Sequence, residues 1–357
     1  MLIQTNKNHF NALTGIRAIA AIMIFVYHNR KYWKDDIHPE LFRLCNELNL
    51  GVQLFFVLSG FLIAKSYGTK PFQSLTNYKN YLLQRIMRIM PLYWLLISLY
   101  YLDSDFGKQK FSALHYLLLH GFSSSHSLEV IAQAWSLTVE MSFYILAPLL
   151  LVLIEKNTKY LVYFLLFLFV STIAAGNLWS YINGNPNNYF QPVEFVLMST
   201  FSGQSILFFA GILYAKYESY ITKHLLNKNV TLIGGLGFLL LIYGIGFFQV
   251  SRIDHGTNHW QGKLLFFTLL PTFIILLFHG LIHEKTYLQK FLASKFMLLL
   301  GNASFAFYLI HISYVNLKLK TFIFLPDRNF CLLWIIAIML YYFFEKPIYN
   351  WYRNKNQ

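Results

Sequence analysis

Ten apolar stretches, each close to the length that crosses a bilayer, constrain this chain more than any other feature. A membrane-spanning helix needs about 20 mostly apolar residues. The sequence therefore predicts an all-α polytopic membrane protein that forms a single membrane domain over residues 1–357. The predicted spans are residues 10–28, 48–67, 84–102, 135–154, 160–179, 202–217, 231–250, 263–282, 297–316 and 327–345.

The composition supports this fold class. Only 12% of the residues are charged and 56% are hydrophobic, whereas soluble domains have about 25% charged residues. The net charge of +14 comes without basic low-complexity runs, so basic loops on an anionic leaflet explain most of it and no nucleic-acid partner is expected. Whether the remaining charge serves an anionic ligand stays open. Cys45 and Cys331 are too few for a disulfide framework, and their pairing stays open.

The distribution of Lys and Arg predicts the orientation. Ten spans place both termini on one side of the membrane. With the termini inside, the inner segments hold 17 of the 29 basic residues, the outer segments hold 11, and Arg17 lies within the membrane. The positive-inside rule then places both termini in the cytoplasm. The longest outer loops, residues 29–47, 103–134 and 180–201, are rich in Asn, Ser, His and aromatic residues.

The first apolar helix carries a charged residue and a histidine. Arg17 and His28 are eleven residues apart, which is 20° past three turns, so they share a face and lie roughly 16 Å apart. Between them Ala20, Ala21 and Ile24 are small enough to leave a groove or to admit close packing. A charge inside a membrane helix is a functional hypothesis. The alternative is that Arg17 snorkels to the headgroups while His28 sits at the opposite interface.

Two further helices carry polar residues near their ends. Ser59-Gly60 lets a neighbouring helix approach closely, and packing alone is a sufficient explanation for it. Arg85 and Arg88 are i,i+3 neighbours at the predicted cytoplasmic end of the third helix. Two guanidinium forks on one face suit phosphate recognition, although a positive-inside anchor predicts arginines here as well.

The fourth predicted helix opens with Trp135 and Ser136 on the outer side, and Glu140 follows one turn later. A carboxylate at this depth needs a partner, and His28 lies in the same half of the membrane. Such a pair fixes the imidazole tautomer and raises its basicity. A purely structural ion pair is the alternative. Trp135 offers a stacking surface for a sugar ring.

The ninth and tenth helices also contain polar residues. Ser304, Tyr308 and His311 fall within 60° of one another around a helix, which predicts one polar stripe facing the bundle interior. A satisfied hydrogen-bond network is the alternative role. Pro347 is expected to stop the last helix. His255 and His259 have i,i+4 spacing, but they lie in a loop with Gly and Asn, so no metal site is expected.

Taken in order, these motifs resemble the acyltransferase-3 family of integral membrane O-acyltransferases. The resemblance covers residues 10 to about 352, and Met141 departs from it because a second acid often follows the family's Glu. The motifs are Arg17 with His28, the run at 51–63 with Ser59, Arg85-x-x-Arg88, Trp135-Ser136 to Glu140, Ser304 to His311, and Phe344-Glu345-Lys346-Pro347.

The resemblance implies transfer of an acyl group, most often acetyl, to a hydroxyl of a surface or lipid-linked carbohydrate. The essential histidine of the family corresponds to His28 and its basic partner to Arg17. A stand-alone member is expected, without a fused hydrolase-like domain, in a bacterial cytoplasmic membrane. The partners are then acyl-CoA, a glycan acceptor and the bilayer, with no permanently bound cofactor and no metal.

We expect the acyl-CoA phosphates near Arg85 and Arg88, with Arg17 as a further donor-binding residue, and the thioester reaching His28 along the first helix. His28, oriented by Glu140, acts as general base or takes the acyl group covalently. The rival is a transporter or flippase for an acidic or lipid-linked solute, and a third reading is a lipid-binding scaffold. The acceptor, the acyl group and the oligomeric state stay open.

Overall fold

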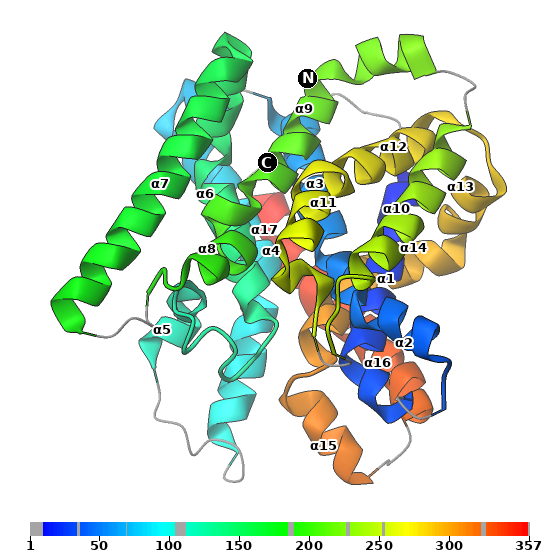
Figure 1. The fold of residues 1–357 in the computed structure, drawn as a ribbon. Coiled ribbons are helices and arrows are strands. Elements are labelled where there is room, and N and C mark those ends of the chain that lie inside the picture. Colours follow the sequence, from blue (N-terminus) through cyan, green and yellow to red (C-terminus); the bar gives the residue numbers. More distant parts are fainter. Residues whose placement is uncertain are drawn as a thin grey trace. The chain divides into compact units, whose positions relative to one another are not determined.

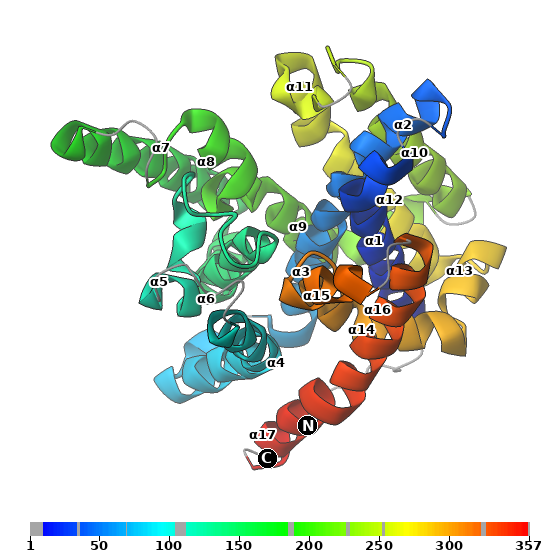
Figure 2. The ribbon, with the colours of Figure 1, turned by 90° about the horizontal axis from the view of Figure 1, so that it is seen from below.

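The computed structural model describes residues 10–33, 36–68, 70–103, 112–184, 189–225, 229–251, 254–322 and 326–355, and within these ranges it contains helices and no strand. Its α-helices, shown in Figures 1 and 2, are α1 (Asn11–Asn29), α2 (Pro39–Asn46), α3 (Gly51–Tyr67), α4 (Leu75–Leu102), α5 (Ala113–Tyr116), α6 (Ala134–Lys156), α7 (Thr158–Asn183), α8 (Val193–Ser199), α9 (Phe201–Leu225), α10 (Val230–Gly246), α11 (Trp260–Thr268), α12 (Leu270–His283), α13 (Tyr287–Leu292), α14 (Lys295–Ile310), α15 (Tyr314–Phe322), α16 (Pro326–Leu340) and α17 (Lys346–Lys355).

Short turns of other helix types connect several of these elements. The 3₁₀ turns are η1 (Arg30–Trp33), η2 (Leu48–Leu50), η3 (Lys70–Gln73), η4 (Leu119–Phe122) and η5 (Gly256–Asn258), and η6 (Tyr341–Glu345) is a π-helical turn.

Eight helical stretches in the described part of the chain are long and apolar enough to cross a membrane, and α10 and α14 are shorter apolar helices. The prediction of an all-α polytopic membrane protein is therefore confirmed. The number of ten spans and the cytoplasmic termini stay predictions.

Contacts divide the chain into two compact units, so each unit is described by itself. Unit 1 comprises residues Met1–Leu62, Phe209–Tyr308 and Pro326–Ile338, and unit 2 comprises Ile63–Phe208, Leu309–Leu325 and Met339–Gln357. The single domain expected over residues 1–357 stays a prediction.

The C-terminal helix continues past the point where it was expected to end. Pro347 does not stop it, because a π-helical turn at Tyr341–Glu345 leads directly into α17 at Lys346–Lys355. Proline has no N–H and disrupts an α-helical hydrogen-bond ladder, and the π-helical turn directly before Pro347 is a local departure from that ladder.

Two other predicted helices differ from the structure. The predicted span 263–282 is divided into α11 and α12 at Leu269, two residues before Pro271. The predicted span 297–316 ends at Ile310 in α14, so His311 lies in the following turn.

Helix α1 lies among helices of its own unit (Figure 2). Glycines set how closely these helices approach one another. A Cβ on Gly15 would lie 2.1 Å from a carbonyl oxygen of α13. A Cβ on Gly301 of α14 would lie 2.0 Å from a carbonyl oxygen of α1, and one on Gly51 of α3 would lie 2.8 Å from another. These contacts allow backbone-to-backbone packing, which small residues provide in a membrane.

Aromatic rings fill the cores of both units. In unit 1, Phe307 of α14 stacks on Trp334 of α16 with ring centroids 4.0 Å apart, and Phe25 of α1 packs on Phe307 at 5.8 Å. In unit 2, Phe143 of α6 stacks on Phe208 of α9 at 4.3 Å.

The N-terminus of α10 is capped by a carboxylate from elsewhere in the chain. Glu284 accepts hydrogen bonds from the N–H groups of Val230 and Thr231 at 2.6 and 2.8 Å, and from the Thr231 hydroxyl at 2.6 Å. The first N–H groups of a helix have no partner inside the helix, so an acceptor here stabilises it. Burial raises the pKa of Glu284, but these hydrogen bonds outweigh it and lower the pKa below its ordinary value.

We predict that Glu284→Gln lowers the free energy of unfolding by about 1–2 kcal/mol at neutral pH, which is the effect of losing a cap. The pKa is depressed in the folded state, so this stabilisation is present above the ordinary carboxyl pKa and is lost as the pH falls through the folded value. Thermal melting of the purified protein in detergent, scanned over pH, measures both effects. Glu155→Gln, on an exposed carboxyl of α6, is the control; an equal shift in both variants contradicts the prediction.

Candidate functional site

The residues predicted to form the site fall in both units. Unit 1 holds Arg17, His28, Ser59, Ser304 and Tyr308, and unit 2 holds Arg85, Arg88, Trp135, Ser136, Glu140 and His311.

Helix α1 is unbroken from Asn11 to Asn29, so it presents Arg17 and His28 on one face as the spacing predicts. Arg17 is half-buried and His28 is exposed. Ala20 and Ala21 between them are 0% and 1% exposed, and Gly51 packs on the Ala20 carbonyl. Of the two expectations for this strip, a groove or close packing, the structure has close packing.

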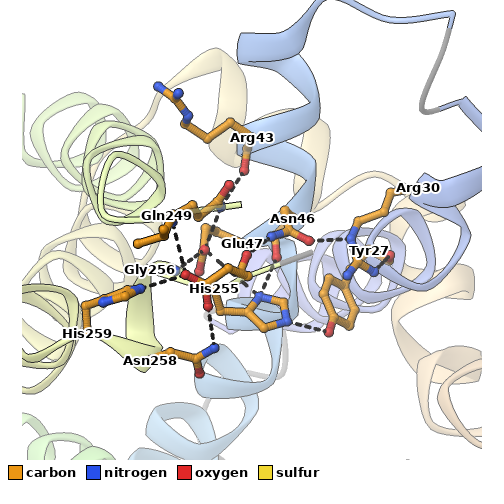
Figure 3. A network of polar contacts seen from close by, with 12 residues as sticks. Tyr27, Arg30, Arg43, Asn46, Glu47, Gln249, His255, Gly256, Asn258 and His259 are labelled. Carbon is orange, nitrogen blue, oxygen red and sulfur yellow. Dashed lines mark hydrogen bonds and ion pairs between the residues drawn. The ribbon is translucent and has the colours of Figure 1, made fainter. Parts of the chain in front are cut away.

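The C-terminal end of α1 carries a polar network that the sequence reasoning missed (Figure 3). Arg30 is only 7% exposed, and its Nη1 donates to the Tyr27 carbonyl oxygen at 2.6 Å. The Tyr27 hydroxyl lies 3.2 Å from Nε2 of His255, a residue of the loop between α10 and α11. In the sequence this loop is marked by the i,i+4 spacing of His255 and His259. In the structure only His255 joins the network, because His259 pairs with Asp254 at 2.6 Å.

No group of three or more potential metal-ligating side chains occurs among the residues that the structure describes.

The predicted polar stripe on α14 is formed in part. Ser304 is fully buried, and its hydroxyl donates to the Gly301 carbonyl oxygen at 2.8 Å within the same helix. Tyr308 lies one turn later on the same face. His311 is buried in the turn beyond the helix end, so helical spacing does not describe its position. Ser59 is half-buried on α3.

In unit 2 a buried tyrosine connects two predicted site residues. Tyr144 lies one turn after Glu140 on α6, is 5% exposed, and donates from its hydroxyl to Glu140 Oε1 at 2.5 Å. The Arg85 guanidinium lies 5.9 Å from the centre of the Tyr144 ring. Glu140 and Arg85 therefore both contact Tyr144, which sequence reasoning did not single out.

Arg85 has a second aromatic neighbour. Its Nη2 donates to the Tyr67 hydroxyl at 2.7 Å, and its guanidinium lies 5.3 Å from the centre of that ring. The buried Nε of Arg85 has no hydrogen-bond partner among the described residues, and Arg88, one turn further, is exposed. Two guanidinium groups with donors to spare can bind an anion.

Polar side chains at the start of α6 donate hydrogen bonds to backbone carbonyl groups. The Ser136 hydroxyl donates to the Gln133 carbonyl oxygen at 2.9 Å, and Gln133 Nε2 donates to the Leu309 carbonyl oxygen at 2.6 Å. Trp135 is half-buried. Ser136 therefore helps to close the first turn of the helix, while Trp135 keeps part of its surface accessible.

The loop before α6 contains a second group of polar residues that the sequence reasoning left unassigned. His115 Nδ1 lies 2.5 Å from the Tyr101 hydroxyl, and its Nε2 lies 3.2 Å from Glu129 Oε2. The His120 ring is 5.0 Å from the His115 ring and 1% exposed, and neither of its nitrogens has a hydrogen-bond partner among the described residues. Burial lowers the pKa of both imidazoles, that of His120 to about 4.

We predict that acid destabilises the protein through His120. The unfolded chain takes up a proton as the pH falls below about 6.5, whereas folded His120 stays neutral until about pH 4. Stability therefore falls across this window, by up to about 3 kcal/mol from this group. Thermal melting of His120→Leu between pH 7 and 4 is expected to show a flatter pH dependence than the wild type. His126→Gln, on an exposed histidine of the same loop, is the control, and a wild-type slope in His120→Leu contradicts the prediction.

Comparison with known proteins identifies the family. A family model described as an acyltransferase domain matches residues 10–351. A protein of Staphylococcus aureus strain COL named "Putative O-acetyltransferase" is 25% identical over 368 aligned residues, which cover 94% of this chain and 56% of the relative. O-acetyltransferase OatA of strain NCTC 8325 is 24% identical over 374 residues, covering 96% of this chain and 58% of the relative.

The chain spans about half the length of the curated relatives it matches. No solved structure matches it. The family model covers nearly the whole chain, including every motif on which the resemblance rests. The chain is therefore a member of the acyltransferase-3 family of integral membrane proteins.

Proposed function

We propose that this chain is a membrane O-acetyltransferase. It moves an acetyl group from cytoplasmic acetyl-CoA to a hydroxyl of a surface or lipid-linked carbohydrate, in a bacterial cytoplasmic membrane. The observation that carries the proposal is α1, an unbroken apolar helix that presents Arg17 and His28 on one face in a chain of the acyltransferase family.

Arg85 and Arg88 are the proposed donor-binding residues. They are i,i+3 neighbours on α4, and a guanidinium fork matches the oxygen geometry of a phosphate. The aromatic rings of Tyr67 and Tyr144 hold Arg85 in place. Arg17 adds a third positive charge for the CoA phosphates.

Arg17 and His28 are eleven positions apart on α1, which is roughly 16 Å along the axis. An extended donor arm covers a distance of this order, so the phosphates and the thioester can be held at opposite ends of the helix. Ala20 and Ala21 are covered by protein, so the arm would run beside this strip and not upon it.

His28 is the proposed catalytic residue. As general base, its imidazole takes the proton of the acceptor hydroxyl while the oxygen attacks the thioester carbon. The C–S bond then breaks, and the imidazolium returns the proton to the CoA thiolate. In the covalent variant, a neutral nitrogen of His28 attacks the thioester carbon, the C–S bond breaks, and the CoA thiolate takes the imidazole proton and leaves as the thiol. The acceptor hydroxyl then attacks the acetyl-imidazole, the C–N bond breaks, and the hydroxyl proton passes to the released imidazole nitrogen.

Glu140 is the proposed orienting partner of His28. The Tyr144 hydroxyl donates to one of its carboxylate oxygens, which restrains the orientation of the carboxylate. Trp135 is the proposed stacking surface for the acceptor sugar, because it is half-buried at the start of α6. Ser59, Ser136, Ser304, Tyr308 and His311 are assigned to the supporting polar lining.

We predict that His28→Ala lowers acetyl transfer by 10²- to 10⁴-fold, the usual contribution of a general base. The assay follows label from [¹⁴C]acetyl-CoA into the glycan fraction of membrane vesicles. His224→Ala, on an exposed histidine of α9, is the matched control. Wild-type transfer in His28→Ala would falsify the proposed chemistry. Flux of an acidic solute without any acetyl transfer would favour the transporter.

We predict that Arg85→Ala and Arg88→Ala weaken binding of CoA. A hydrogen bond to a charged group contributes about 1.5–3 kcal/mol, so each dissociation constant should rise about 10- to 100-fold. Equilibrium binding of labelled CoA to the purified protein measures this. Arg353→Ala, on an exposed arginine of α17, should bind as the wild type does. If neither variant binds more weakly than this control, the phosphate assignment is wrong.

A further inference from the structure

We propose that His255 is a positioning residue for acyl transfer, which acts by holding the Tyr27 ring against His28. His255 belongs to the loop between α10 and α11, more than 220 residues from α1 in sequence. The inference rests on the proposed function, in which His28 carries the chemistry.

Tyr27 contacts both histidines (Figure 3 shows its bond to His255). Its hydroxyl lies 3.2 Å from His255 Nε2. Its ring meets the His28 ring edge to face, with centroids 4.7 Å apart and an angle of 69° between the planes. Restricting the Tyr27 ring therefore restricts the space in which the exposed His28 imidazole can turn.

The surroundings of His255 determine which of its two ring nitrogens accepts a hydrogen bond from Tyr27. Nδ1 lies 3.1 Å from the Asn46 carbonyl oxygen, which can only accept a hydrogen bond, so Nδ1 carries the proton. Nε2 is then the acceptor, and the Tyr27 hydroxyl donates to it. Since its one proton is committed to His255, Tyr27 acts on His28 through its ring and not as an acid.

Arg30 holds the other side of Tyr27. Its guanidinium lies 4.1 Å from the centre of the Tyr27 ring, a cation–π contact, and its Nε donates to Asn46 Oδ1 at 2.5 Å. Asn46 therefore binds Arg30 through its side chain and His255 through its backbone carbonyl. The two residues that hold Tyr27 are thus both held by Asn46.

A buried carboxylate fixes the loop that carries His255. Glu47 is 0% exposed, and its Oε1 accepts from the Gly256 N–H at 2.6 Å and from Gln249 Nε2 at 2.7 Å. A Cβ on Gly256 would lie 1.8 Å from a carbonyl oxygen of α10, so only glycine lets the loop approach this closely. The hydrogen bond to Glu47 and the close packing of Gly256 on α10 thus both fix the backbone next to His255.

The charges around His255 favour its neutral form. Burial lowers its pKa, and the nearby Arg30 cation lowers it further, against the smaller opposing effects of the Asn46 carbonyl and Asp254. Asp254 itself is tied within the loop by His259 at 2.6 Å and by Asn258 at 2.7 Å. A neutral imidazole is what accepting the Tyr27 hydroxyl requires.

Four variants of the full chain test the proposal in membrane vesicles, with [¹⁴C]acetyl-CoA as donor and the glycan of the vesicles as acceptor. Tyr27→Phe removes the hydroxyl and keeps the ring. His255→Leu removes the acceptor, whereas His255→Gln can return an acceptor oxygen near the position of Nε2. The fourth variant is the double change Tyr27→Phe with His255→Leu. Thermal melting confirms that each variant is folded.

We expect Tyr27→Phe and His255→Leu each to lower kcat about 10-fold without changing KM for acetyl-CoA. The double variant should fall no further, because both changes break one hydrogen bond, and His255→Gln should recover part of the rate. A merely structural role would lower the melting temperature and leave kcat per folded molecule unchanged.

Wild-type kcat in both single variants, or losses that multiply in the double variant, would overturn the proposal while leaving His28 as the base. A fully active His28→Ala would instead overturn the proposed function. His224→Leu serves as the control for loss of an imidazole in unit 1 and should transfer at the wild-type rate.

Discussion

Close packing of helix backbones around α1 is the constraint on which the rest of unit 1 depends. Lipid tails are as apolar as leucine, so helices in a bilayer gain their affinity from close approach and from interhelical hydrogen bonds. Gly15, Gly51 and Gly301 provide that approach, since a Cβ at any of them would lie within 3 Å of a neighbouring carbonyl oxygen. The helix that carries Arg17 and His28 is thereby fixed along much of its length, and its polar ends have defined surroundings.

Buried polar groups occur at the C-terminal end of α1 and where α4 meets α6. At the first place Arg30 and His255 both hydrogen-bond to Asn46, and Glu47 accepts from the Gly256 N–H. At the second place Arg85 and Glu140 are both in contact with Tyr144. A buried charge is costly unless it is hydrogen-bonded, so these contacts make it possible to keep ionisable groups inside the membrane domain. Each unit thus contains buried ionisable groups whose partners are ordered.

The sequence predicts the helices well, because long apolar runs have few alternatives in a bilayer, and the spacing of Arg17 and His28 follows from an unbroken α1. It fails where local geometry departs from the α-helix: a π turn carries the chain through Pro347, and α14 ends one residue before His311. It also misses His255 and Tyr144. The partners of His255 lie more than 200 residues away, and a histidine between Asp and Gly looks like a solvated loop residue until the fold brings α1 beside it.

The central claim is that a donor bound on the cytoplasmic side delivers its acetyl group to an acceptor on the other side. Sealed membrane vesicles of both orientations, given [¹⁴C]acetyl-CoA from outside, test it most directly. We predict labelled ester in inside-out vesicles, on glycan protected from an added esterase, and none in right-side-out vesicles. Equal labelling in both orientations, or ester that the added enzyme removes from intact inside-out vesicles, would contradict the account.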